Sequence, residues 1–222
     1  EEALGKLGIT YDRLDIFLTH KHHDHCGLAS EYAARGARLF MNPQEDRHCY
    51  DCLYYNHSHG STEDQPQVLQ SVGVTEDGTP EIWNMFMEVN QRIRENRGWE
   101  FEIPGYPYTP VSEGRILSYG DYDLETVGLK GHTYGQMGLY DRNHKILFCA
   151  DQVIDGIVPI VGTTYPDEHL LKGYFDSLEK LKHQYVDCLI LPAHKEPIRD
   201  VKRVVDRIVF AYLDKTDLIK HI

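Results

Sequence analysis

Four short segments that carry histidine and aspartate, each following a run of apolar residues, constrain this chain more than any other feature. The first is Thr19-His-Lys-His-His-Asp-His-Cys-Gly27, and the other three lie far along the chain. Imidazole and carboxylate are the groups that bind zinc and similar divalent ions at neutral pH. The candidate ligands are His20, His22, Asp24, His25, His132, Asp151 and His194. A fold that suits this sequence must bring these seven residues together.

The apolar runs before these segments are typical of short buried strands. Strands are expected at 14–18, 123–127, 145–149 and 188–191, each directly followed by candidate ligands. Catalytic residues often lie on loops that a rigid scaffold holds in place, and strand ends can gather such loops along one edge. Further strands are expected at 37–41, 115–118 and 137–140, and helices at 26–35, from Pro43, from Thr79, at 170–181 and at 198–213. The pattern predicts an α+β protein with the candidate ligands at strand ends.

Residues of about 44–110 differ in character from the rest of the chain. They are rich in polar residues and tyrosine, and they hold one clear helix that starts at Thr79 with Pro80 in its first turn. We interpret this region as a helical insertion or cap within a single domain, 1–222. Cys49, Cys52, His57 and His59 have the residue types of an extra zinc site, but their spacing is unlike that of a zinc finger.

Length and composition exclude several classes of protein. The length of 222 residues suits one domain with a sizeable core. No apolar stretch approaches the roughly 18 residues that cross a bilayer, and the start resembles no secretion signal, so we expect a cytoplasmic protein without membrane partners. Five cysteines make a disulfide framework improbable. The net charge of -12 disfavours a nucleic-acid partner and leaves a small-molecule substrate as the expectation.

At the candidate ligands the chain resembles the metallo-β-lactamase superfamily. The run His20-x-His22-x-Asp24-His25, together with His132, Asp151 and His194, matches its five motif positions. The resemblance implies a four-layer αββα sandwich with two metal ions. By this likeness His20, His22 and His132 bind the first ion, Asp24, His25 and His194 bind the second, and Asp151 bridges the two.

The chain also departs from the family pattern. Tyr134 replaces the proline of the usual Gly-His-Thr-Pro-Gly motif, and Gln136 follows Gly135. Ala193 and Lys195 flank His194, where the family usually has Gly-His-Gly. We expect these changes to alter the substrate fit rather than the metal ligands, and we name Tyr134 as a candidate substrate-binding residue. Only 19 residues precede the first histidine, so the sandwich is expected to lack its N-terminal strands. Either the natural protein is longer or another chain completes the sheet, which makes a homodimer an option.

The resemblance favours hydrolysis. A hydroxide shared by two dications would attack an ester, thioester, lactone or related bond, with Asp24 as the catalytic residue that orients the nucleophile. We expect zinc, with manganese or iron as alternatives. Likenesses at Tyr174–Leu181 and Pro192–Arg199 point weakly to the glyoxalase II-like branch. The alternatives are a di-iron redox protein of the same fold and a non-catalytic, metal-stabilised binding protein.

Overall fold

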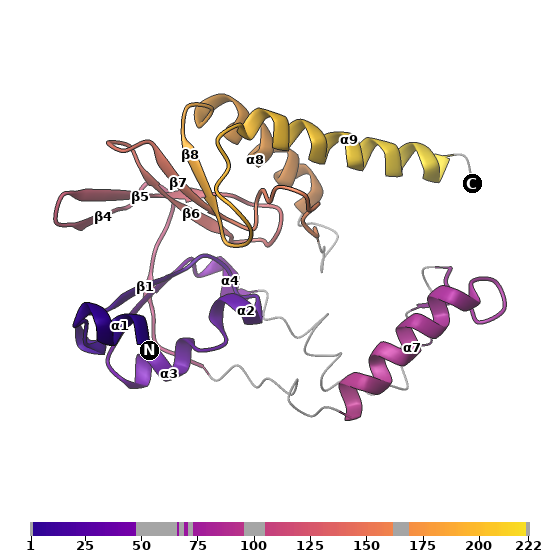
Figure 1. Ribbon diagram of the computed structural model, residues 1–222, viewed down its shortest axis with the longest axis horizontal. Coiled ribbons are helices and arrows are strands. Elements are labelled where there is room, and N and C mark those ends of the chain that lie inside the picture. Colours follow the sequence, from indigo (N-terminus) through magenta and orange to yellow (C-terminus); the bar gives the residue numbers. More distant parts are fainter. Residues whose placement is uncertain are drawn as a thin grey trace.

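Two β-sheets and the helices on their outer faces form the body of the chain (Figure 1). The computed structural model describes residues 2–47, 66, 69–70, 73–95, 105–161 and 169–220. In this part of the chain the first sheet has the order β1-β2-β3 and the second has the order β4-β5-β6-β7-β8. The α+β class expected from the sequence is confirmed.

The first sheet contains only parallel strands. They are β1 (Asp15–Leu18), β2 (Arg38–Met41) and β3 (Thr109–Pro110). Successive side chains of a strand point to opposite faces, and the buried residues follow this rule. Phe40 contributes to a core against the second sheet, whereas its neighbours Leu39 and Met41 pack toward the other face. Both faces of this small sheet are therefore covered.

The second sheet is antiparallel except for its last pair of strands. Its strands are β4 (Ile116–Tyr119), β5 (Tyr122–Gly128), β6 (Met137–Asp141), β7 (Ile146–Ala150) and β8 (Leu189–Pro192). β6 runs antiparallel to both β5 and β7, and β8 runs parallel to β7. It follows that β5, β7 and β8 all run the same way and end at the same edge of the sheet. These are the three strands that precede His132, Asp151 and His194.

Three apolar cores give the order of the layers. One packs β1 and β2 against α3 (Ala29–Ala34), and a second, around Phe40 and Met137, lies between the two sheets. The third and largest packs the second sheet against α8 (Leu170–Gln184) and α9 (Val201–Lys220). The described elements thus stack as helix, sheet, sheet and helices, in the order expected from the resemblance.

The remaining helices are short or lie apart from the sandwich. They are α1 (Glu2–Leu7), a 3-10 turn (Tyr11–Arg13), α2 (His23–Cys26), α4 (Gln44–Arg47) and α7 (Pro80–Glu95). The helix expected over 26–35 corresponds to the shorter α3, because Cys26 ends the separate helix α2 and α3 begins only at Ala29. No helix within the described ranges is long and apolar enough to span a membrane.

The helix expected from Thr79 is confirmed as α7, which begins at Pro80. The Thr79 hydroxyl donates a hydrogen bond to the carbonyl oxygen of Thr75, and the Thr79 hydroxyl oxygen accepts one from the Thr75 N–H. Cys49, Cys52, His57 and His59 lie outside the described residues, as does part of the expected insertion. The role of residues 44–110 as a cap therefore stays a prediction, and so do the missing N-terminal strands.

Candidate metal centre

The first candidate ligands leave the end of β1 in a tight loop. After Leu18 the chain passes His20 and His22 and then turns into α2, where the amides of His25 and Cys26 both donate to the carbonyl oxygen of His22. The buried Cys26 thiol donates to the carbonyl oxygen of Lys21 at 3.4 Å. This local bonding lets one short run of the chain present four candidate ligands.

His132 lies on the loop between β5 and β6, and a glycine makes that loop possible. Gly131 has a φ of 140°, a backbone conformation that L side chains rarely adopt. A Cβ at this position would stand 2.3 Å from the Cα of Tyr174 on α8. The loop is therefore pressed directly against the helix, which fixes the base of His132.

Asp151 and His194 follow the adjacent strands β7 and β8. The register of this pair shifts between Phe148 and Ala150, an irregularity of the kind that often re-aims side chains near functional sites. Ala150 has a φ of 51° and Lys195 a φ of 70°, so both neighbours of these ligands adopt the left-handed region. The Ala193 amide donates to the carbonyl oxygen of Ala150 at 3.0 Å, which ties the two strand ends together.

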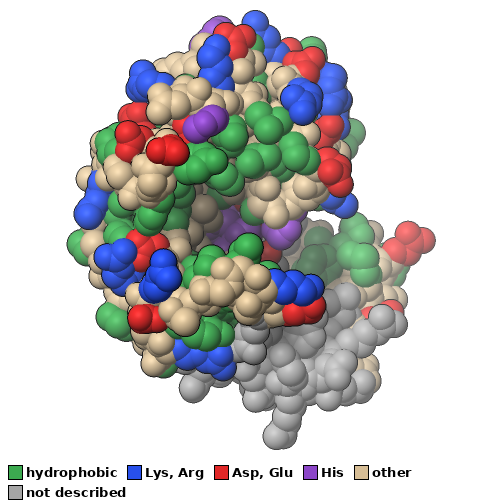
Figure 2. Space-filling view, turned by 60° about the vertical axis from the view of Figure 1, so that its left-hand side comes forward, with side chains coloured by type: hydrophobic (Ala, Val, Ile, Leu, Met, Phe, Trp, Pro, Cys, Tyr) green, Lys and Arg blue, Asp and Glu red, His purple; other side chains and the backbone are tan. Residues whose placement is uncertain are grey.

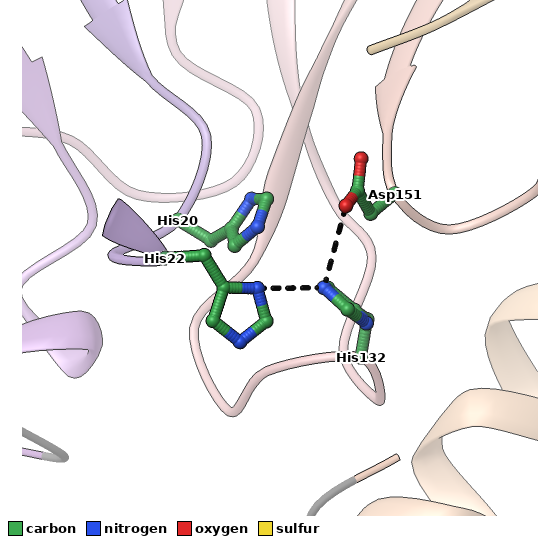
Figure 3. A group of neighbouring side chains, drawn as sticks. All are labelled: His20, His22, His132 and Asp151. Atoms are coloured by element: carbon green, nitrogen blue, oxygen red, sulfur yellow. Dashed lines mark hydrogen bonds and ion pairs between the residues drawn. The ribbon is translucent and has the colours of Figure 1, made fainter. Parts of the chain in front are cut away.

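All seven candidate ligands converge in two adjoining groups. One group is His20, His22, His132 and Asp151, and the other is Asp24, His25 and His194. Within each group the potential ligand atoms lie within 4.8 Å of one another. Figure 3 shows the first group, with the side chains converging from three loops and His132 Nε2 facing His22 Nδ1 at 2.8 Å.

Asp151 lies between the two groups. Its Oδ2 atom is 3.6 Å from Nε2 of His132 in the first group, and 3.4 Å and 3.7 Å from Nε2 of His25 and His194 in the second. Asp24 completes the second group with its Oδ2 atom 3.3 Å from Nε2 of His194. One carboxylate oxygen thus faces imidazoles of both groups, as a bridging ligand must.

Burial keeps the imidazoles of the first group neutral. It lowers the pKa of His20 well below its usual value, lowers that of His22 to about 3, and lowers that of His132. His25 differs, because the neighbouring Asp151 raises its pKa against the effect of burial. A neutral imidazole keeps a lone pair free at neutral pH, which is the form that a metal ion needs.

Buried polar atoms without hydrogen-bond partners show whether the site suits a cation. His20 Nε2 and Asp151 Oδ1 are buried without a hydrogen-bond partner among the described residues. The other nitrogen of His20 contacts the Thr19 hydroxyl at 3.0 Å, and Nδ1 of His132 lies 2.7 Å from the carbonyl oxygen of Ile160. Buried polar atoms rarely go without partners, so these atoms fit a site built for metal.

The centre is open to solvent on one side. Figure 2 shows histidine side chains at the bottom of a hollow with hydrophobic side chains along its rim. Ile160, whose carbonyl oxygen contacts His132, is 74% exposed. A substrate with an apolar portion can therefore approach the candidate ligands.

Tyr134, the candidate substrate-binding residue, is not a member of either ligand group. Tyr134 packs its ring 4.1 Å from the Lys130 ammonium group and lines a surface groove of about 420 Å³. Tyr106 and Tyr108 pack against the core of the first sheet, which fits a structural role. Substrate binding by Tyr134 stays a prediction.

The sequence does not predict three contacts that support the loops carrying the candidate ligands. The Glu45 carboxylate, the Gln136 amide and the carbonyl oxygen of Ile160 all contact the loops that carry the ligands. The sequence marks Gln136 only as part of a departure from the family pattern, because its contact with the Asp151 amide depends on how two separate loops pack. Nothing in the sequence around Glu45 signals that a residue at a helix start becomes buried against a distant loop.

The family model that matches this chain is the Metallo-beta-lactamase superfamily, over residues 14–194. The chain belongs to this superfamily. The match covers every candidate ligand, so the family expected from the motif residues is confirmed. The glyoxalase II-like branch is not singled out by these comparisons and stays a prediction.

Solved structures of this superfamily share the fold. A metallo-beta-lactamase family protein, TTHA1429 from Thermus thermophilus, superposes with a TM-score of 0.71 and 21% identity, covering 98% of this chain and 67% of that one. A beta-lactamase domain protein from Burkholderia ambifaria gives a TM-score of 0.66 and 22% identity, covering 96% of this chain and 60% of that one. At these identities the likeness supports the fold and nothing finer.

Curated relatives match a shorter part. Acyl-coenzyme A thioesterase MBLAC2 of Gallus gallus is 43% identical over 53 residues, which are 24% of this chain and 19% of the relative. MBLAC2 of Homo sapiens is 33% identical over 63 residues, or 27% of this chain and 23% of the relative. The matched segment thus spans about a fifth of these relatives.

Proposed function

We propose that this chain is a metal-dependent hydrolase that cleaves thioesters. The observation that carries the proposal is the placement of Asp151 Oδ2 within 3.4–3.7 Å of imidazoles from both ligand groups. That arrangement supports two ions side by side, held by His20, His22 and His132 on one side and by Asp24, His25 and His194 on the other. Bound dications supply a water of lowered pKa and a Lewis acid for the carbonyl group.

The chain's own residues prepare the site for this chemistry. Burial keeps His20, His22 and His132 neutral, so no proton has to leave these rings before they act as ligands. The carbonyl oxygen of Ile160 accepts a hydrogen bond from the Nδ1–H of His132, which keeps the proton on Nδ1 and leaves Nε2 as the ligating atom. Asp24, about half exposed at the mouth of the site, is placed to orient the attacking water.

The substrate class rests on two supports. The relatives with the matched segment are named acyl-coenzyme A thioesterases, and the hollow above the histidines has an apolar rim. In the proposed reaction water adds to the thioester carbonyl carbon, the carbon–sulfur bond breaks, and the products are a carboxylate, a thiol and one proton released to solvent. Zinc is the expected ion, and iron is an alternative because histidine and carboxylate bind both.

Metal content and thioester cleavage, measured on the same samples, test the proposal. The zinc-loaded chain should bind about two ions and release thiol from acyl-coenzyme A, detected with a thiol reagent. Asp151→Ala should lose activity by at least about 1,000-fold and lose both ions, because both groups share this carboxylate. Asp24→Ala should lose the activity but keep the first ion.

His183→Ala is the matched control, since His183 is exposed on α8, where it contacts Glu179. It should keep both ions and full activity. A zinc-loaded chain that cleaves no thioester, lactone or phosphodiester would contradict the hydrolase proposal and favour a non-catalytic or redox role. Full activity in Asp151→Ala would contradict the ligand assignment.

A further inference from the structure

Glu45 is a buried carboxylate that joins two of the ligand loops. It lies on α4, directly after β2, and exposes only 2% of its surface. Its Oε2 atom accepts the N–H of Lys21 at 2.9 Å. Its Oε1 atom accepts the hydroxyl of Thr133 at 2.7 Å and the N–H of Gly135 at 2.6 Å. Three donors from two loops thus converge on one side chain.

Each donor stands close to a candidate ligand in the chain. Lys21 separates His20 from His22, and Thr133 directly follows His132. The first loop belongs to the first sheet and the second loop to the second sheet. Glu45 therefore spans the two sheets at the point where the first ligand group assembles.

The surrounding contacts show that the fit is close. A Cβ on Gly135 would stand 2.8 Å from the Glu45 amide nitrogen and 2.9 Å from Glu45 Oε1, so only glycine fits there. Asn42 donates from its side chain to the carbonyl oxygen of Gly135 at 2.8 Å. The segment 42–45 thus holds both the N–H and the carbonyl group of the same loop residue.

The first loop is held in the same manner. The Lys21 ammonium group, on the residue whose amide Glu45 binds, forms an ion pair with Asp46 at 2.7 Å. Burial raises the pKa of Glu45, whereas its three hydrogen bonds favour the charged carboxylate. Burying a carboxylate is unfavourable unless hydrogen bonds compensate. The three hydrogen bonds of Glu45 therefore indicate that its role is to hold the two loops in place.

We propose that Glu45 is a positioning residue that sets the distance between His20 and His22 on one loop and His132 on the other. The inference rests on the proposed metal-binding function of those histidines. Glu45 acts on them through the backbone of Lys21 and Gly135 and the hydroxyl of Thr133. Ligands held by such hydrogen-bonded partners lose about 10–100-fold in metal affinity when the partner is changed.

Glu45→Gln tests this proposal with little change of shape. A glutamine has one acceptor oxygen and places an NH₂ group where the second oxygen stood, so it cannot accept from both loops. Zinc titration against a chromophoric chelator should show about 10–100-fold weaker binding at the first ion site. Thr133→Val removes one donor of the three, and it should give a smaller loss of zinc affinity in a chain that keeps its fold.

Asp141→Asn is the matched control. Asp141 is also a buried carboxylate, and it accepts the amide and ring N–H of His144 in a surface turn. This change should lower the melting temperature without weakening zinc binding. Zinc affinity within about 3-fold of wild type in Glu45→Gln, or an equal loss in Asp141→Asn, would overturn the positioning role.

Amide hydrogen exchange separates this proposal from the proposed function. In the metal-free chain the amides of Lys21 and Gly135 should exchange slowly, and at least one should exchange faster by about 10-fold or more in Glu45→Gln. Unchanged exchange at both amides would overturn the positioning role. This measurement needs neither zinc nor substrate, so a failure of the hydrolase proposal leaves its outcome readable.

Discussion

Residues on either side of the ligands hold unusual backbone conformations. Ala150 and Lys195 both have positive φ values, 51° and 70°, and each is adjacent to a candidate ligand in the chain. A residue with a Cβ in this region costs about 1–2 kcal/mol relative to ordinary conformations. Such strain persists where the surrounding structure holds it, and it often marks functional sites. The family pattern, which places glycine after the last histidine, has a physical reason in this φ value.

Lys195→Gly should therefore stabilise the chain. Glycine removes the strain of about 1–2 kcal/mol, and its greater freedom in the unfolded chain offsets about half, which leaves a gain of about 0.5–1 kcal/mol. Thermal unfolding should show a rise of about 1–4 °C, because each kcal/mol shifts the melting temperature by about 2–4 °C at this size. Lys215→Gly, at an exposed position inside α9, should lower stability by about 1 kcal/mol instead. Two equal decreases would refute the account of strain at Lys195.

At the scale of elements, the loop that carries His132 packs closely against α8. A Cβ on Gly131 would overlap the Tyr174 backbone, and Tyr174 itself donates its hydroxyl proton to the carbonyl oxygen of Gln152 at 3.0 Å. Gln152 follows Asp151 in the chain. The start of α8 thus braces the loops of two candidate ligands at once.

Gly131→Ala should separate the loop from the helix. We expect a loss of about 3 kcal/mol or more, from the positive φ and from overpacking, together with weaker zinc binding. Gly156→Ala is the control, because Gly156 has a φ of 88° but open space around its Cα. It should cost only about 1–2 kcal/mol and leave zinc binding unchanged. Chemical denaturation and zinc titration measure both effects, and equal costs in the two variants would contradict the packing argument.

The sequence predicted these elements better than it predicted their contacts. Apolar runs located the strands that deliver His20, His132, Asp151 and His194, since burial and strand period are local properties of the sequence. The burial of Glu45 could not be predicted, because the loop that buries it lies 90 residues away in the chain. The break between α2 and α3 was missed because the ligand loop, rather than helix propensity, sets where the chain turns.

At the scale of the whole molecule, the candidate metal centre joins the two sheets. His20, His22, Asp24 and His25 follow a strand of the first sheet, whereas the other three ligands follow strands of the second. The core between the sheets is small, with Phe40, Val111, Leu117 and Met137 as its buried members. Outside the ligands, Asp15 of the first sheet accepts the Tyr119 hydroxyl of the second at 2.8 Å. Bound ions would therefore add substantially to the hold between the sheets.

Removal of metal should accordingly lower the thermal stability of the chain. An ion present at 100 times its dissociation constant stabilises the folded state by about 2.7 kcal/mol, and each kcal/mol shifts the melting temperature by about 2–4 °C at this size. We expect chelation to lower the melting temperature by about 5–10 °C for each ion lost, and zinc to restore it. Asp151→Ala should show no response to chelator or zinc, because its bridging carboxylate is gone, while His183→Ala should respond as wild type does. A zinc-loaded wild-type chain that melts at the same temperature after chelation would show that the sheets hold together without the ions.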